Sequence, residues 1–337
     1  MKKTLSVLKY IVIFSVGVFL LSRVYKEYNL DNLTNTLHNI QWSWVILSLI
    51  FGILSHISRA IRWNMLINPL GFKPKLTNTF FSVMIMYATN LIVPRGGELA
   101  RCTTLSKYEK IPFSKLVGTV VTERATDTLI LLILVIITFL SQINIFKQFL
   151  INNPKFGENI SFIFSIWFWI ISITISISII ITIWKYRSAL KKIKIINKLF
   201  ELLHNFFEGI KSIKKLESPF IFIAHSIFIY VMYFLMMYVV FLSYPPTAHI
   251  KMTAGLTAFI MGGLGMLMPV QGGIGAWHFM VIETLSIYNI DKIYGQDFAL
   301  ISHTSMNLML LIVGGISFIL MPIYNKTINK PSHKNNL

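Results

Sequence analysis

The sequence predicts an all-α polytopic membrane protein with about six full transmembrane helices and two shorter, broken elements. Hydrophobic residues make up 55% of the 337 residues, and the mean hydropathy is +0.66. Only 13% of the residues are charged, about half the share usual in a soluble domain. Several apolar runs reach the ~18 residues that indicate a membrane span, and they lack the alternating pattern of barrel strands.

The apolar runs differ in length, and this difference separates full spans from partial ones. A helix needs about 20 residues to cross the ~30 Å hydrocarbon core. The run 77–93 would reach only about 25 Å as a helix, and the runs 252–268 and 276–290 are similarly brief. We therefore expect six full spans and two re-entrant elements. In chain order the runs cover about 5–22, 43–58, 77–93, 116–141, 161–184, 219–243, 252–268, 276–290 and 297–322.

The distribution of basic residues supports this topology. If the N-terminus is inside and run 77–93 returns to the same side, 24 of the 31 Lys and Arg residues lie in inner segments. Arg59 and Arg62 are among these 24 residues. Six further Lys and Arg residues lie in outer segments, and Arg124 lies within a span. Full crossing by this run would move the basic segment 185–217 outside, against the positive-inside rule. We expect both termini in the cytoplasm, a location in the cell inner membrane, and no nucleic-acid partner for the net charge of +18.

The chain divides into two similar units. We expect residues 1–325 to form one transmembrane domain, followed by a polar cytoplasmic tail at 326–337. Repeat units at about 43–141 and 219–322 would cross the bilayer in opposite directions, as an inverted repeat. Apolar residues recur at helical spacing in the basic segment 185–217 between them. This segment is either an amphipathic helix on the anionic inner surface or a solvated connector.

Two segments, 93–101 and 268–278, interrupt apolar runs with proline followed by glycines. A helix broken inside a membrane leaves backbone N–H and C=O groups that lipid cannot satisfy. Such breaks in corresponding positions of two halves indicate a transport site, although Gly and Pro are also common in ordinary membrane helices. The glycines that we expect to contribute to binding are Gly96, Gly97, Gly272, Gly273 and Gly275.

Charged residues surround the first break. Arg95, Glu98 and Arg101 are spaced three residues apart. If a helix begins after Gly97, Glu98 lies in its first turn, where the helix dipole favours negative charge. Backbone N–H groups, a helix N-terminus and two arginines would together form a phosphate site. The alternative is a cluster whose charged ends reach the membrane interface.

The span at 116–141 carries a second charged group. Each ionisable residue inside a span is unfavourable by about 2.5–3.5 kcal/mol, so it needs a partner or a function. Glu123 and Asp127 are four residues apart and share a helical face, and Arg124 can reach Asp127. The group is either a structural ion pair or the lining of a polar cavity that contacts a headgroup or carries protons.

The second half contributes His278 near the break, and His303 and Asn307 on one face of the last span. These histidines either pack through hydrogen bonds or handle protons. The chain has no HExxH or CxxC metal pattern, no Walker loop and no GxSxG nucleophile. We expect no catalytic residues, no metal, no cofactor and no enzyme activity.

Three motifs occur in a fixed order along the chain. They are Pro94-Arg95-Gly96-Gly97-Glu98-Leu99-Ala100-Arg101, Glu123-Arg124-x-x-Asp127 and Pro269-x-x-Gly272-Gly273-x-Gly275. Over about residues 5–325, this pattern resembles the lysylphosphatidylglycerol synthase transmembrane region family, also called the flippase-like domain family. The resemblance implies a bacterial or archaeal inner-membrane protein that moves a lipid with a charged or glycosylated headgroup.

The chain departs from the family pattern at two positions, with Gln271 where relatives tend to have Pro and His278 where they tend to have Glu. Relatives that make aminoacylated phosphatidylglycerol carry a soluble transferase domain after the membrane part. Because this chain ends at Leu337, we do not expect synthase activity. The resemblance assigns functional positions most directly to Gly97, Glu98, Arg101, Glu123, Arg124 and Asp127.

We therefore expect a lipid carrier that works by alternating access on an anionic phospholipid or a polyprenyl-linked headgroup. Arg95, Arg101 and Arg124 would hold the headgroup, while Glu123 and Asp127 would balance charge or bind protons. The alternatives are a membrane-embedded transferase acting on lipid headgroups and a small-solute secondary transporter. Membrane lipids are the expected partners, with a homo-oligomer or a separate lipid-modifying enzyme as further options.

Overall fold

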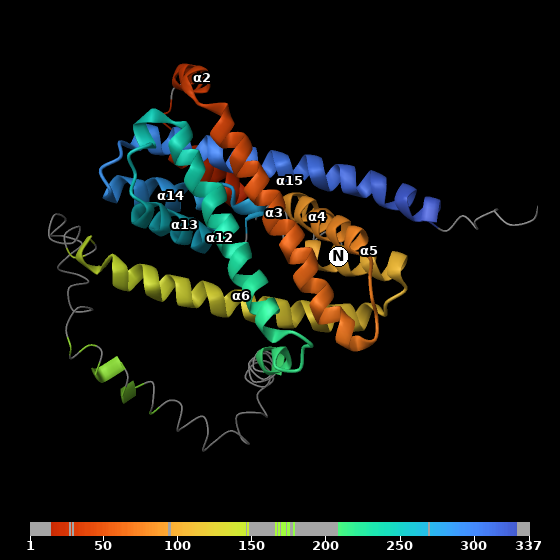
Figure 1. Ribbon diagram of the computed structural model, residues 1–337. Coiled ribbons are helices and arrows are strands. Elements are labelled where there is room, and N and C mark those ends of the chain that lie inside the picture. The colour runs from red at the N-terminus through yellow and green to blue at the C-terminus, as the bar shows by residue number, and fades with distance from the viewer. Residues whose placement is uncertain are drawn as a thin grey trace, which may run out of the picture.

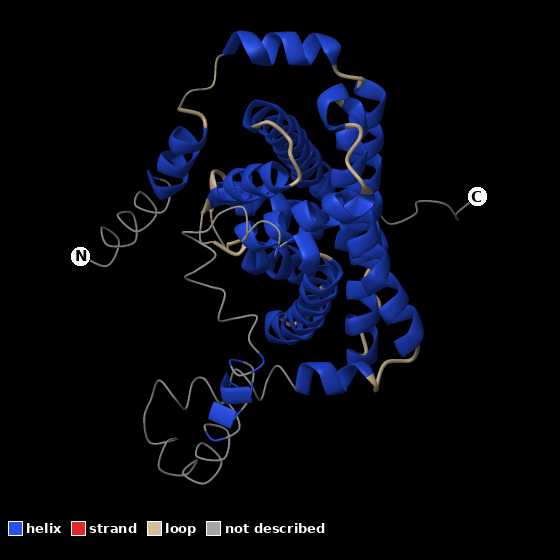
Figure 2. Ribbon diagram, turned by 90° about the vertical axis from the view of Figure 1, so that its left-hand side faces the viewer, coloured by secondary structure: helices blue, strands red, loops and turns tan. Residues whose placement is uncertain are grey.

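The computed structural model describes residues 15–93, 96–145, 208–268 and 270–328, apart from Glu27 and Asn29, with isolated residues between 147 and 178. Every regular element in these ranges is a helix (Figures 1 and 2), which confirms the expected all-α class. The predicted span 161–184, most of the basic segment 185–217 and the tail beyond Ile328 lie outside the described residues. Of the first predicted span, the helical piece Ser15–Val24 is described.

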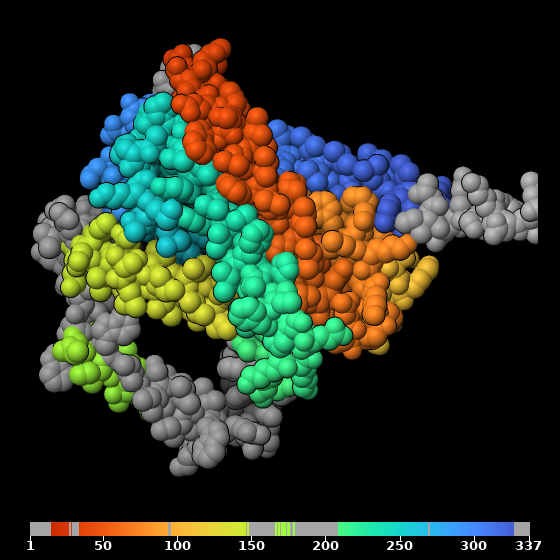
Figure 3. All heavy atoms as spheres, viewed as in Figure 1, coloured from red at the N-terminus to blue at the C-terminus, as the bar shows by residue number. Residues whose placement is uncertain are grey.

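Four helices are long and apolar enough to cross a membrane, and they match four of the six predicted full spans. Large apolar side chains are exposed along them, as expected for surfaces that face lipid tails. Figure 3 shows three of these helices, α3, α6 and α12, at the surface of one face. The four helices are α3 (Trp42–Ile67), α6 (Phe113–Ser141), α12 (Pro219–Ser243) and α15 (Lys292–Ile328).

Helix α3 extends well beyond the apolar run from which it was predicted. The run ends near residue 58, but the helix continues to Ile67. The sequence placed Arg59 and Arg62 in a segment after this span, whereas both lie on the helix itself. Both side chains are buried within the helical bundle, because they face acidic residues on α6 that compensate their charge.

Each predicted break joins two short helices into a hairpin. Helices α4 (Leu76–Ile92) and α5 (Gly97–Glu109) pack together around the first break. Asn90 Oδ1 accepts a hydrogen bond from the Gly97 N–H at 2.8 Å, which satisfies one free donor at the start of α5. Glycine is needed here because a Cβ at position 97 would collide with the carbonyl oxygen of Met86.

The second hairpin consists of α13 (Met252–Met266), the short 3-10 turn η4 (Gln271–Gly273) and α14 (Ala276–Ile287). Its helices also pack against one another. Gly272, Gly273 and Gly275 all have positive φ, at 56°, 73° and 81°. Residues with a Cβ rarely adopt this conformation, so the glycines allow the chain to turn sharply between the two helices.

The two halves of the described chain pair with each other element by element. Helix α3 packs along α12, α4 packs against α15, and α13 packs against α6. In Figure 1, α3 and α12 run in opposite directions, as do α6 and α15. The two hairpins lie on opposite sides of the crossing of α3 and α12 in this view.

Each hairpin has its own apolar core. Trp63, Leu105 and Leu116 belong to the core of the first hairpin. In the second, Phe241 and Phe298 stack with ring centroids 3.8 Å apart. A third group that includes Met84 and Met309 lies where α4, α12 and α15 meet. Three further short elements are α2 (Leu30–Asn39), which was not predicted, η1 (Asn68–Leu70) and η3 (Pro245–Thr247).

Candidate functional site

Seven charged side chains from three helices meet inside the first half of the protein, and we call them the charge cluster. Four are arginines and three are carboxylates. The side chains of Arg62, Arg101 and Glu123 have no exposed area. The members are Arg59 and Arg62 on α3, Glu98 and Arg101 on α5, and Glu123, Arg124 and Asp127 on α6.

Glu123 is the centre of the cluster. Its Oε1 accepts hydrogen bonds from Arg59 Nη1 and, at 3.1 Å, from Arg62 Nη2. Its Oε2 accepts from Arg101 Nη1 at 2.9 Å. A single carboxylate thus joins α3, α5 and α6 through charge-assisted hydrogen bonds, which are stronger than neutral ones.

Asp127, one helical turn further along α6, repeats this pairing. Its two oxygens accept from Arg59 Nη1 at 3.0 Å and from Arg62 Nη2 at 2.7 Å. Arg62 also donates through Nη1 to Ser226 Oγ on α12, at 3.1 Å. The predicted common face of Glu123 and Asp127 is therefore confirmed, and arginines on α3 occupy that face.

The cluster is exposed at one side, where Arg124 and Glu98 lie. The Arg124 side chain is 44% exposed, and its Nε lies 3.2 Å from Glu98 Oε1. Its Nη2 lies 3.6 Å from both Glu123 and Asp127. Arg101 Nε and Glu98 Oε2 form an ion pair at 2.8 Å without the angle of a hydrogen bond. Arg124 thus links the buried carboxylates to the surface.

The cluster carries an excess positive charge. Four guanidinium groups face three carboxyl groups, so the formal net charge of the cluster is +1. Arg101 Nη2 is buried and has no hydrogen-bond partner in the part of the chain that the structure describes. The Arg101 guanidinium lies 4.5 Å from the ring centroid of Trp63, a cation–π contact that holds it in place. The buried Nη2 of Arg101 is thus a donor that the carboxylates of the cluster leave unused.

The structure brings together most of the predicted site residues of the first half. Glu98, Arg101, Glu123, Arg124 and Asp127 all belong to the charge cluster. Gly96 and Gly97 form the start of α5, with Glu98 in its first turn as expected. Arg95 lies outside the described residues.

Sequence reasoning missed Arg59, Arg62 and Trp63. The available signal was their spacing, because two arginines three residues apart share a helical face. The signal was not used because the arginines follow the end of an apolar run, where a cytoplasmic loop is the ordinary interpretation.

The predicted residues of the second half form a separate group, which we call the histidine cluster: His278, His303, Asn307 and Gly272. The rings of His278 on α14 and His303 on α15 have centroids 4.5 Å apart. His303 Nε2 lies 2.8 Å from the carbonyl oxygen of Gly272. Asn307 Nδ2 lies 3.0 Å from His303 Nδ1, as expected for two residues on one face.

The two breaks contact each other. Gln271 Nε2 donates to the carbonyl oxygen of Ile92, at the end of α4, at 3.1 Å. A Cβ at Gly272 would lie only 3.0 Å from the Leu91 side chain. Within the described residues, however, no hydrogen bond or ion pair joins the charge cluster to the histidine cluster. The predicted site is thus divided into two clusters, and the breaks beside them are in contact.

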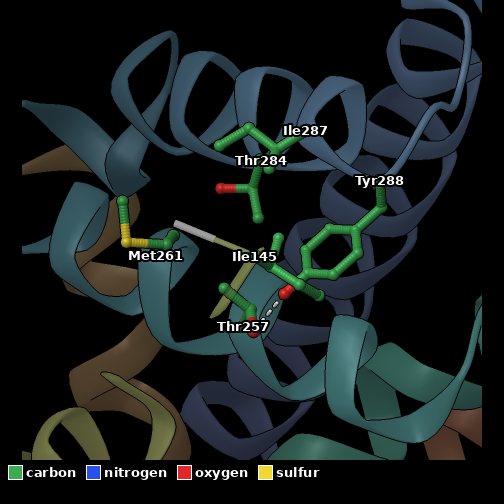
Figure 4. A pocket seen from close by; sticks show the side chains of 6 residues that line it. All are labelled: Ile145, Thr257, Met261, Thr284, Ile287 and Tyr288. Atoms are coloured by element: carbon green, nitrogen blue, oxygen red, sulfur yellow. Dashed lines mark hydrogen bonds between the residues drawn. The ribbon is translucent and has the colours of Figure 1, made fainter. Parts of the chain in front are cut away.

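Two cavities lie outside these clusters. The cavity in Figure 4, between α13 and α14, measures about 10 Å³, enough for about one water. A groove of about 330 Å³ lies between α4, α5 and α15 and is lined by apolar residues, two threonines, Lys107 and Tyr108. Among the described residues, no group of three His, Cys, Asp or Glu side chains is placed to hold a metal ion.

The fold and the site together define a class of helical membrane protein. It has two helical hairpins, each formed at a break in an apolar run, and a buried cluster of charged side chains. The chain belongs to the lysylphosphatidylglycerol synthase TM region family, whose profile matches residues 6–314. It is also similar to the UPF0104 membrane protein MJ1595 of Methanocaldococcus jannaschii. The two are 25% identical over 319 residues, which cover 90% of this chain and 92% of that protein.

Proposed function

We propose that the protein moves a lipid with an anionic headgroup across the cell inner membrane by alternating access. The lipid is a phospholipid or carries a polyprenyl-linked headgroup. The charge cluster is the headgroup site. The protein does not change the lipid chemically, and it needs no metal or cofactor.

The excess positive charge of the cluster carries this proposal. A buried salt bridge that served stability alone would be no better than apolar packing of the same volume. Ionisable groups within membrane helices are instead associated with substrate pathways. Here one arginine more than the carboxylates require is present, and Arg124 is exposed enough to meet a ligand. The planar guanidinium matches a phosphate in shape and charge.

A phosphodiester headgroup fits the charge of the site. Such a headgroup carries one negative charge, which would neutralise the cluster. Arg124 would bind it first, and the buried Nη2 of Arg101 would supply a further donor. Repulsion by Glu98, Glu123 and Asp127 would disfavour more than one added negative charge.

The pairing of the two halves supports the alternating-access part of the proposal. In an inverted repeat α3 would correspond to α12, and the contact of α4 with α15 would correspond to the contact of α13 with α6. These contacts are all present, and α3 and α12 run in opposite directions, as do α6 and α15. In this topology α4–α5 enters from the inner face and α13–α14 from the outer face. The glycines at the two breaks would allow the hairpins to rock around the site.

Reconstituted vesicles test the function. Purified protein is expected to speed the movement of a headgroup-labelled anionic phospholipid between leaflets, with the mass of the lipid unchanged. A changed lipid mass would instead support the membrane-embedded transferase. Uptake of a small solute without lipid movement would support the secondary transporter. Co-purification of a lipid-modifying enzyme, or a stable homo-oligomer, would identify a protein partner.

A further inference from the structure

We infer that the histidine cluster is a proton-binding site that controls the contact between the two breaks. The inference rests on the proposed function only for its consequence in transport. The proton site itself is argued from hydrogen bonds, and it can be tested without any lipid.

The hydrogen bonds define the neutral state of His303. Asn307 Nδ2 donates to Nδ1, so the ring proton is on Nε2 and is donated to the carbonyl oxygen of Gly272. The Oδ1 atom of Asn307 is buried and has no partner in the described part of the chain. One acceptor beside the ring is therefore unused.

The same site can hold the charged ring after a single rotation. Protonation at Nδ1 of His303 places an N–H against the Asn307 amide, which then turns so that Oδ1 accepts it. Both N–H groups of the imidazolium then have acceptors and the buried amide oxygen gains a partner, while Asn307 Nδ2 gives up its bond to the ring. The site thus offers hydrogen bonds to both the neutral and the charged ring, which favours proton binding relative to a ring without such partners.

The surroundings restrict the site to one proton. His278 is in ring contact with His303, and two adjacent imidazoliums would repel each other. Tyr25 contacts His278, with ring centroids 5.8 Å apart. Neither histidine forms an ion pair in the described residues, α13 and η4 carry no ionisable side chain, and Glu283 on α14 is exposed.

The ionisable groups on the other neighbouring helices have different partners. Asp297, on α15 itself, accepts from Tyr28, Thr36 and Tyr244. On α3, α4 and α12, the groups that face the interior contact one another or the charge cluster. They are His56, Arg59, Arg62, Tyr87, Tyr230 and Tyr233. Among the described residues, no carboxylate or guanidinium group is therefore in direct contact with the proton site.

Protonation acts on the contact between the breaks through Gly272. A charged donor strengthens the hydrogen bond to its carbonyl oxygen. The preceding residue, Gln271, donates to Ile92 of the first hairpin. Proton binding at His303 therefore holds the second break in place against α4, and proton release loosens it. In the proposed carrier, this couples movement of the hairpins to the proton gradient.

Trp277 gives a direct readout, because its ring lies 5.0 Å from that of His303 and its indole face responds to a neighbouring cation. Fluorescence of the full chain in vesicles is recorded between about pH 3 and 8, because burial can move the titration of a histidine well away from its ordinary range. The Trp277 signal is the difference between wild type and Trp277→Phe. We expect this signal to change in one single-proton transition.

Three variants interpret the transition. His303→Gln keeps a donor for the Gly272 carbonyl and is expected to abolish the fluorescence transition. His278→Gln is expected to retain the transition. His249→Gln, an exposed histidine before α13, leaves it unchanged. No Trp277 transition in wild type, or a transition that survives in His303→Gln, would overturn the proton site.

Lipid movement then tests the coupling. The wild-type rate is expected to follow the same transition with pH, and the rate of His303→Gln to be independent of pH. A fluorescence transition combined with a rate of lipid movement that does not depend on pH would overturn the coupling. A fluorescence transition in a protein that moves no lipid at any pH would support the proton site and contradict the proposed function.

Discussion

At the scale of single residues, Glu123 holds the first half of the protein together. Its carboxylate is fully buried and contacts Arg59, Arg62 and Arg101. These arginines lie on two different helices, and a neutral side chain at position 123 would leave them competing for the remaining carboxylates. The stability of the cluster should therefore depend on this charge.

The substitution Glu123→Gln tests this dependence. Removal of one partner from a buried ion pair typically destabilises a protein by about 3–5 kcal/mol, so we expect a marked fall in the thermal unfolding midpoint in detergent. The control is Glu208→Gln, which removes an exposed pair with Lys211 that is worth at most about 1 kcal/mol. Equal midpoints for the two variants would show that the cluster does not stabilise the fold.

The acidic members of the cluster could be predicted from the sequence, but two of its arginines could not. Carboxylates deep in an apolar run have few explanations, so Glu123 and Asp127 were recognised by position and spacing. Arg59 and Arg62 follow a run of apolar residues, and arginine is common at that place in loops. Only their contact with α6, which is tertiary, distinguishes a buried arginine from a cytoplasmic one.

At the scale of elements, the α4–α5 hairpin depends on a close approach at Gly97. A Cβ there would meet the Met86 carbonyl and the Asn90 side chain. Asn90 also caps the first turn of α5. The position of Glu98 and Arg101 thus depends on a residue that has no side chain.

The substitution Gly97→Ala is expected to force the hairpin apart, at about 1–3 kcal/mol for overpacking, and to slow lipid movement. Gly118→Ala is the matched control, because a Cβ at Gly118 on α6 meets nothing within 4 Å and alanine favours a helix by about 0.5–1 kcal/mol. Thermal unfolding and the vesicle assay measure both. A Gly97→Ala protein as stable and active as Gly118→Ala would contradict this packing.

Both breaks could be predicted from the sequence, because Pro followed by paired Gly ends an apolar run at corresponding positions of the two halves. Helix α2 was not predicted, since it is short and polar. The hydrogen bond from Gln271 to Ile92 joins residues far apart in the chain, and no local pattern predicts such a contact.

At the scale of the whole molecule, the proposed topology can be tested by labelling from either side of the membrane. The background is low because the single cysteine, Cys102, is buried. Leu76→Cys and Lys115→Cys flank the first hairpin, and both are expected to be labelled from the inner side. Met252→Cys and Lys292→Cys flank the second hairpin and are expected to be labelled from the outer side.

Each pair must share a side for the hairpins to be re-entrant. If positions 76 and 115 were labelled from opposite sides, α4 and α5 would cross the membrane together. The inverted repeat would then be lost, and with it the rocking movement that we propose.

The central claim is that the charge cluster binds an anionic headgroup, and the most direct test is lipid preference in vesicles. We predict that wild type moves a labelled anionic phospholipid faster than a zwitterionic one. Arg124→Ala should reduce movement of the anionic lipid about tenfold or more, as for loss of a hydrogen bond between charged groups, while Arg23→Ala, an exposed arginine outside the cluster, should not. Equal movement of both lipids by wild type, with no effect of Arg124→Ala in a folded protein, would contradict the claim.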